Sequence, residues 1–203
     1  PGDHPLDPAV LGAAARSGLR IEACGPEQVS LSLVPSPEAE GPLLQLGAGS
    51  DGLGRPSAVL TGLTLQSEAD SALIGITGGD GVVLKEMALQ GGAWASLIEV
   101  SGSADVQISN ATLTGGRHMV SATDSQLSLS GVDLSDGTVA GIWSTSGTTG
   151  ITLNNVSIHN ISPAPGFTTS VGGFGLFVDG GQLNATDLRI SNVSVAGILA
   201  DAT

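Results

Sequence analysis

The residues with the clearest potential for chemistry are two aromatic side chains and two aspartates that recur in similar sequence contexts. Three short segments share one pattern, in which a glycine and an apolar residue precede a larger side chain: 141–145, 175–179 and 197–201. If these segments are strands, alternation turns Trp143, Phe177 and Leu199 away from the core. Asp179 and Asp201 then fall on the same outer face. Such a ladder of apolar side chains beside two carboxylates suits the binding of a sugar or a calcium ion.

Two other interpretations of this ladder stay open. The segment 161–173 lengthens the repeat beside it and is placed to fold over Trp143 and Phe177, which would make the two rings a satellite core without a ligand. A pair of carboxylates such as Asp179 and Asp201 also suits glycoside hydrolysis. The opposite orientation of the strands is disfavoured, because it would bury both aspartates unpaired at a cost of several kcal/mol.

A repeat of roughly two dozen residues supplies the strands that would hold this ladder. Each unit opens with alternating apolar and polar residues, which is the pattern of a strand with one buried face, and the six units begin at Ala58, Val82, Val106, Leu127, Ile151 and Leu183. The fifth position of each unit is a residue that tolerates the left-handed backbone needed at a corner, with Glu86 as the exception: Gly62, Glu86, Asn110, Gly131, Asn155 and Asp187.

A second strand, a second bend and a third strand complete each unit. Because the phase of the alternation resets at each corner, the pattern predicts a chain that winds rather than a flat sheet. We therefore expect an all-β solenoid with three short strands per winding and three parallel sheets around a dry core. Equivalent core residues are expected to line up in one inner row: Leu60, Leu84, Ile108, Leu129 and Leu153.

These repeats resemble the right-handed parallel β-helix of the pectate-lyase-like superfamily, over residues 29–203. The likeness rests on units such as 106–113 and 197–200, and the stretch 19–25 resembles the opening of secreted bacterial β-helix proteins. The resemblance implies the fold and leaves the activity open, because this fold hosts lyases, hydrolases, adhesins and stalks.

The catalytic patterns of that superfamily are missing from the sequence. Its hydrolases carry an adjacent Asp pair, a Gly-His-Gly stretch and an Arg-Ile-Lys stretch, whereas here Arg189-Ile190 is followed by Ser191. Its lyases gather several acidic calcium ligands around a basic residue, and the few basic residues of this chain are scattered among the units. His118 and His159 belong to different strands of different units, which disfavours a metal site. We therefore predict no catalytic residues and no metal ligands.

Two domains are expected. Residues 1–28 form an N-terminal cap, with a helix at about 8–17 that begins at Asp7-Pro8, followed by a first strand. Residues 29–203 form the solenoid, with about seven to eight windings that continue beyond residue 203. Cys24 is the only cysteine, so it is either a small buried hydrophobe or the partner of a thiol elsewhere, and its pairing state stays open.

The composition fits a packed and strongly acidic chain. Apolar residues make up 40% of the sequence, glycine occurs 31 times, and the net charge is −13. A protein this acidic is a poor partner for nucleic acid or for anionic membranes, which need basic patches. No apolar run is long enough to span a bilayer, so we expect no membrane insertion.

Together these features favour a non-catalytic, secreted or cell-surface scaffold that binds a polysaccharide or a surface protein through one face. No cofactor is expected, although the outer face with Asp179 and Asp201 would suit a calcium ion. The alternative is a carbohydrate-active enzyme, a polysaccharide lyase or glycoside hydrolase, whose site is incomplete in this sequence. The oligomeric state and the identity of the ligand stay open.

Overall fold

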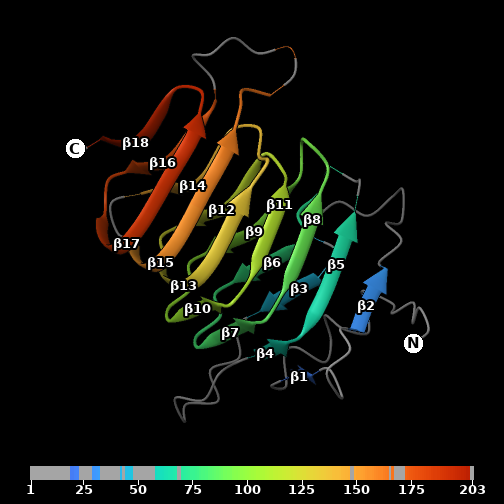
Figure 1. Ribbon diagram of the computed structural model, residues 1–203. Coiled ribbons are helices and arrows are strands. Elements are labelled where there is room, and N and C mark those ends of the chain that lie inside the picture. Colours follow the sequence, from blue (N-terminus) through green and yellow to red (C-terminus); the bar gives the residue numbers. More distant parts are fainter. Residues whose placement is uncertain are drawn as a thin grey trace.

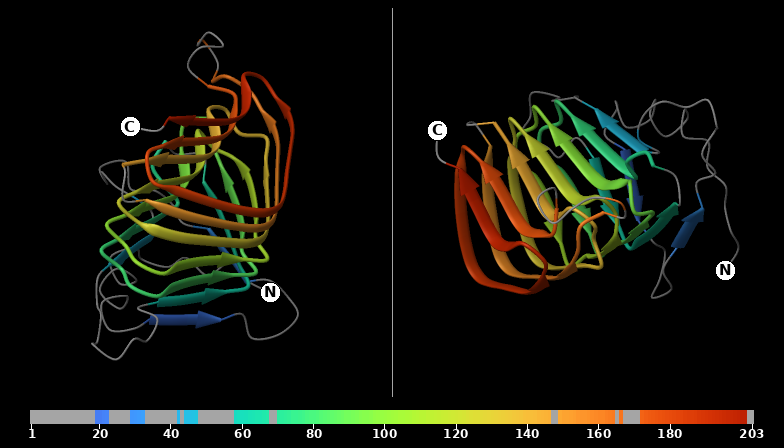
Figure 2. Two further views of the ribbon diagram at one scale, coloured as in Figure 1. Left: turned by 90° about the vertical axis from the view of Figure 1, so that its left-hand side faces the viewer. Right: turned by 90° about the horizontal axis from the view of Figure 1, so that it is seen from above.

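The structure is a computed structural model that describes residues 19–22, 29–32, 42, 44–47, 58–67, 70–146, 149–164, 166 and 172–201. In this part of the chain every element is a strand, and the strands are wound about a common axis (Figure 1, Figure 2). The expected helix at 8–17 and Cys24 lie outside these residues. No helix in the described part is long and apolar enough to cross a membrane.

About six turns follow one another from Ala58 onward, and each of the first three turns has three strands. These nine strands are β4 (Ala58–Thr61), β5 (Leu63–Ser67), β6 (Ile74–Thr77), β7 (Val82–Lys85), β8 (Ala88–Gly91), β9 (Ser96–Ser101), β10 (Val106–Ser109), β11 (Thr112–Gly115) and β12 (His118–Thr123). Three earlier strands pair with the first turn: β1 (Leu19–Glu22), β2 (Val29–Ser32) and β3 (Leu44–Gly47).

Each of the last three turns has two strands, because the first strand runs through the first corner without a break. These strands are β13 (Gln126–Ser135), β14 (Ala140–Thr145), β15 (Gly150–Ile161), β16 (Phe174–Asp179), β17 (Gln182–Val193) and β18 (Ala196–Asp201). The three strands expected per winding are therefore separate elements from β1 to β12, whereas from β13 onward the first two are continuous. The long strands join the first two rows of strands, so the solenoid has an 11-stranded and a 7-stranded sheet instead of three separate sheets.

The corner residue explains how a strand bends without ending. Gly131, Asn155 and Asp187 have φ angles of 63°, 53° and 53°, which turn the chain within one residue. Parallel pairing resumes directly after the corner, where Val132 pairs with Val156. Glu86 has the same left-handed conformation, with a φ of 55°, although glutamate is a poor corner residue. The neighbouring windings fix the place of the turn, so Glu86 adopts it regardless of its intrinsic preference.

The core is a set of apolar columns in the register that the repeat predicts. Leu60 pairs with Leu84, Leu84 with Ile108, Ile108 with Leu129, and Leu129 with Leu153. All five side chains are buried and belong to one hydrophobic cluster. The expected inner row is therefore confirmed. Burial of these columns is the main stabilising term, at about 25 cal/mol for each Å² of apolar surface removed from water.

Candidate functional site

The aromatic ladder lies on the outer face of the 7-stranded sheet, on three neighbouring strands. Trp143 of β14 pairs with Phe177 of β16, and Phe177 pairs with Leu199 of β18. Ile142, the residue before Trp143, is fully buried, whereas Trp143 and Phe177 are half-buried and Leu199 is exposed. Alternation thus points Trp143 and Phe177 outward, because Ile142 and Leu176 before them fill the core. Leu199 takes the same register position on the last strand.

The rings of this ladder stack on one another along the solenoid axis. The ring centres of Trp143 and Phe177 are 4.0 Å apart with an angle of 10° between their planes. His118 of β12 stacks on Trp143 at 5.1 Å and 27°. We call His118, Trp143 and Phe177 the aromatic column. Because Trp143 has a ring on either side, the column presents ring edges to solvent more than open ring faces.

His118 is the titratable member of the aromatic column. Burial, and to a lesser degree the positive charge of Arg117, lower the pKa of His118 from 6.5 to about 4. The imidazole is therefore neutral at neutral pH and acts as a flat ring in the stack.

The two expected aspartates lie beside the column. Asp179 and Asp201 are register partners on β16 and β18, with Asp179 half-buried and Asp201 exposed. The corresponding positions of the two preceding windings are Thr123 and Thr145, whose hydroxyl oxygens are 3.0 Å apart. In the described part of the chain, no group of three or more His, Cys, Asp or Glu residues is placed to hold a metal ion. A calcium ion at this face therefore stays a prediction that rests on two carboxylates.

The loop expected to cover the rings falls partly outside the described residues. Positions 165 and 167–171 of the segment 161–173 are not described. The described residues leave Trp143 and Phe177 half-buried. Whether the segment seals them stays a prediction.

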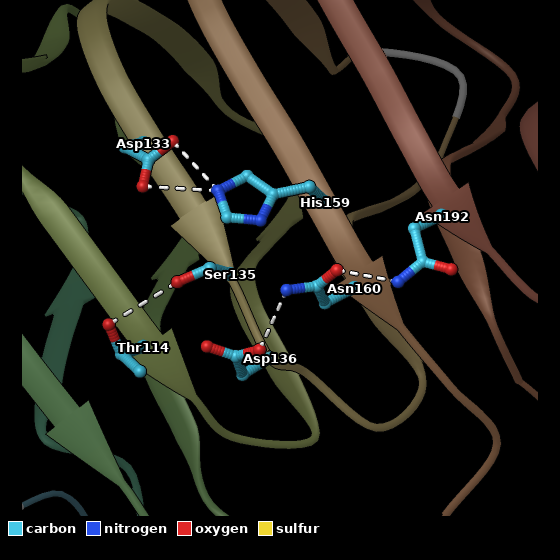
Figure 3. Close-up of polar contacts among 7 residues, drawn as sticks. All are labelled: Thr114, Asp133, Ser135, Asp136, His159, Asn160 and Asn192. Carbon is cyan, nitrogen blue, oxygen red and sulfur yellow. Dashed lines mark hydrogen bonds and ion pairs between the residues drawn. The ribbon is translucent and has the colours of Figure 1, made fainter.

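A second cluster, which the sequence analysis did not single out, lies on the outer face of the 11-stranded sheet (Figure 3). His159 of β15 places its Nε2 atom 3.2 and 3.3 Å from the two carboxylate oxygens of Asp133 on β13. Both side chains are partly exposed, so this contact contributes little to stability. The repeat columns align Asp133 with Ser157, two residues before His159, so column alignment alone does not bring the two side chains together.

A column of amide and carboxylate groups follows this cluster at the second corner (Figure 3). The Asn160 Nδ2 atom donates a hydrogen bond to Asp136 Oδ1 at 3.0 Å, and Asn192 Nδ2 donates to Asn160 Oδ1 at 2.6 Å. All three residues have positive φ angles. The corner favours Asn and Asp because these residues tolerate a positive φ angle. Their side chains then lie above one another and form hydrogen bonds between successive windings.

The comparisons with known proteins are sparse. No protein-family model matches the chain, and no curated protein matches it. Among solved structures, the chain is similar to the crystal structure of a "putative glycosyl hydrolase" from Parabacteroides merdae. The alignment covers 95% of this chain and 86% of the other, with 10% sequence identity and a TM-score of 0.46. A likeness this distant says nothing about activity, so the function must be inferred from the geometry of the two faces.

Proposed function

We propose that this protein is a rigid, non-catalytic scaffold, secreted or displayed at the cell surface, that binds a glycan through the outer face of the 7-stranded sheet. The observation that carries the proposal is the aromatic column beside the register pair Asp179 and Asp201. Aromatic carbon atoms supply apolar contact for the C–H groups of a sugar, and carboxylates accept hydrogen bonds from its hydroxyl groups.

The rigidity of the column supports this use. A side chain that is mobile in the free protein loses about 0.5–1.5 kcal/mol of entropy when a ligand immobilises it. Trp143 and Phe177 are already fixed by their 4.0 Å stack and by the parallel strands that carry them. The stack therefore lowers the entropic cost of binding a glycan at these two residues. This gain partly offsets the affinity that is lost because little of each ring face is exposed to the ligand.

The strong acidity of the chain limits the class of glycan that its surface would accept. A net charge of −13 disfavours polyanionic ligands over most of the surface and favours solubility. Neutral glycans are not repelled by such a surface. The expected ligand of the aromatic face is therefore a neutral polysaccharide or glycan.

A glycan array tests the proposal with three proteins: the wild type, the double variant Trp143→Ala/Phe177→Ala, and Trp94→Ala. Trp94 is an exposed tryptophan in the turn between β8 and β9, so its removal is a matched control for the loss of a surface ring. We expect the double variant to bind at least about tenfold more weakly and the control to bind like the wild type. Circular dichroism must first show that all three proteins are folded.

Two results would contradict the proposal. One is a wild type that binds no glycan, and the other is a double variant that binds as tightly as the wild type while staying folded. The non-catalytic part is tested separately, by incubating any bound glycan with the protein and measuring new reducing ends and unsaturated ends. We expect neither to form, with or without added calcium.

A further inference from the structure

The outer face of the 11-stranded sheet brings three different side chains into one row. Asp133 of β13 pairs with Ser157 of β15, and Ser157 pairs with Arg189 of β17. With strands about 4.8 Å apart, the Cα atoms of Asp133 and Arg189 are about 9.6 Å apart. Ser157 has the shortest side chain of the three. The longer side chains of Asp133 and Arg189 therefore stand on either side of a shallow position on the sheet surface.

His159 holds the acid of this row in place. Its Nε2 atom contacts both carboxylate oxygens of Asp133, and Figure 3 shows the ring lying toward Asp133 and away from Asn192 of β17. A carboxylate accepts hydrogen bonds and does not donate them, so the imidazole proton belongs on Nε2. The contact restrains Asp133 while leaving its side chain partly exposed.

Arg189, at the other end of the row, is available to a ligand. Its side chain is exposed, and it forms no ion pair or hydrogen bond with another residue in the described part of the chain. Its guanidinium group carries five N–H donors in a fixed plane. Arg189 is therefore an unused donor that lies opposite a restrained acceptor.

The mixed charges of the row select the chemical class of its ligand. An anion attracted by Arg189 would meet the carboxylate of Asp133, and a cation attracted by Asp133 would meet the guanidinium of Arg189. A neutral ligand with several hydroxyl groups avoids both conflicts, because a hydroxyl donates to a carboxylate and accepts from a guanidinium. The neighbouring outward positions Ser157 and Ser191 add further hydroxyl groups.

We propose that Asp133, Ser157 and Arg189 form a second glycan-binding site, which takes one neutral sugar ring across β13, β15 and β17. One sugar hydroxyl donates to Asp133 and another accepts from Arg189, while His159 is a positioning residue that orients Asp133. This proposal rests on the proposed function in taking a glycan as the ligand, but it concerns the opposite sheet and different residues.

Isothermal titration with defined hexasaccharides tests the second site on the whole chain. The neutral probes are cellohexaose, xylohexaose and mannohexaose, and the charged probes are hexagalacturonate and a chitosan hexamer. We expect a neutral probe to bind, and expect Arg189→Ala and Asp133→Asn each to weaken it at least about tenfold, the loss typical of one hydrogen bond to a charged group. Lys85→Ala is the matched control, because it removes one exposed positive charge from the same sheet, and it should stay within about twofold of the wild type.

Two further variants test the positioning role of His159. His159→Gln keeps an N–H donor that can reach Asp133, so binding should stay within about threefold of the wild type. His159→Leu loses the donor and should bind as weakly as Asp133→Asn. Thermal melting separates this pattern from a general loss of structure, because both substitutions replace a partly exposed side chain and should melt alike.

The outcomes distinguish this proposal from the one for the aromatic face. Loss of binding in Arg189→Ala but not in Trp143→Ala/Phe177→Ala would support the second site alone. The reverse result would overturn the second site and leave the aromatic face standing. A wild type that binds only hexagalacturonate or only the chitosan hexamer would overturn the assignment to a neutral sugar, and so would a wild type that binds none of the five probes.

Discussion

The inside and the outside of each winding obey the same register but select residues by different rules. Along β15, Leu153 points inward and is buried, whereas Thr152 before it points outward and is exposed. The neighbours of Leu153 along the axis are Leu129 and Ala185, and those of Thr152 are Ser128 and Asn184. Inside, the column members are almost all apolar residues that fill the core. Outside, each column carries its own kind of polar or aromatic contact.

The difference shows where this fold has freedom to acquire a function. A column in the core contributes through buried apolar area, so any polar or undersized member is costly. A column on the surface is stabilised by stacking or hydrogen bonds of about 1 kcal/mol each, so it can change from glutamate to serine to tryptophan between windings, as at Glu99, Ser121 and Trp143. The aromatic column and the row from Asp133 to Arg189 are both products of this freedom.

The largest difference between inside and outside is expected for a pair of alanine substitutions at adjacent residues. Leu153→Ala removes a buried side chain between Leu129 and Ala185, and we expect it to lower the free energy of unfolding by about 2–5 kcal/mol. Thr152→Ala, on the other side of the same strand, should change it by less than about 0.5 kcal/mol. Chemical denaturation measures both. Equal losses at the two positions would show that the inside and the outside are not energetically distinct.

A second test uses His118, which lies on the outside but is partly shielded from water. Its pKa is about 4 in the folded chain and 6.5 when exposed, so the unfolded chain takes up the proton first as the pH falls. Stability linked to His118 is therefore complete above pH 6.5 and is lost as the pH falls toward 4. Because tenfold in an equilibrium constant is worth about 1.4 kcal/mol, the loss is at most about 3 kcal/mol.

The control for this pH dependence is His118→Phe, which keeps a flat ring against Trp143 and cannot take up a proton. Titration of the acidic residues is common to both proteins, so the difference between their denaturation curves from pH 7 to pH 4 reports His118 alone. Parallel curves for the wild type and His118→Phe would mean that His118 is solvated like an ordinary surface histidine.

The smallest expected effect has the opposite sign and concerns a polar group inside the core. Ser144 is fully buried between its register neighbours Ala122 and Val178, and its Oγ atom has no hydrogen-bond partner in the described structure. Ser144→Ala should raise the free energy of unfolding by about 1–2 kcal/mol, because an unsatisfied buried hydroxyl is removed. Thr145→Val, which removes the outward hydroxyl bonded to Thr123, should instead lower it slightly. A destabilised Ser144→Ala would reveal a bond that the hydroxyl makes.

The fold followed from the sequence because its signal is repeated. Each apolar column is sampled in every winding, so one poor member, such as Ala185 opposite Leu153, does not hide the register. The same redundancy explains Glu86, which looked like an exception at the corner and yet turns as its neighbours do. What the repeat could not reveal was whether a corner interrupts the strand. That depends on local pairing on both sides of the bend, as at Val132 and Val156.

The candidate sites were only partly within reach of the sequence. Alternation alone places Trp143 and Phe177 on the outer face, but their stacking depends on rotamers, which periodicity does not specify. The contact between Asp133 and His159 joins residues that are neither adjacent in sequence nor in the same column, because His159 reaches diagonally to the preceding winding. Diagonal contacts of this kind need side-chain geometry, and a repeat aligned by columns does not display them.

The unbroken passage of β13, β15 and β17 around the first corner joins two rows of strands into one sheet. Parallel pairing skips only the corner residue and resumes directly after it, so each of these strands is hydrogen-bonded to its neighbour on both sides of the bend. A displacement of one side of the bend therefore carries the other side with it. Both the aromatic column and the row from Asp133 to Arg189 lie mainly on these last three turns.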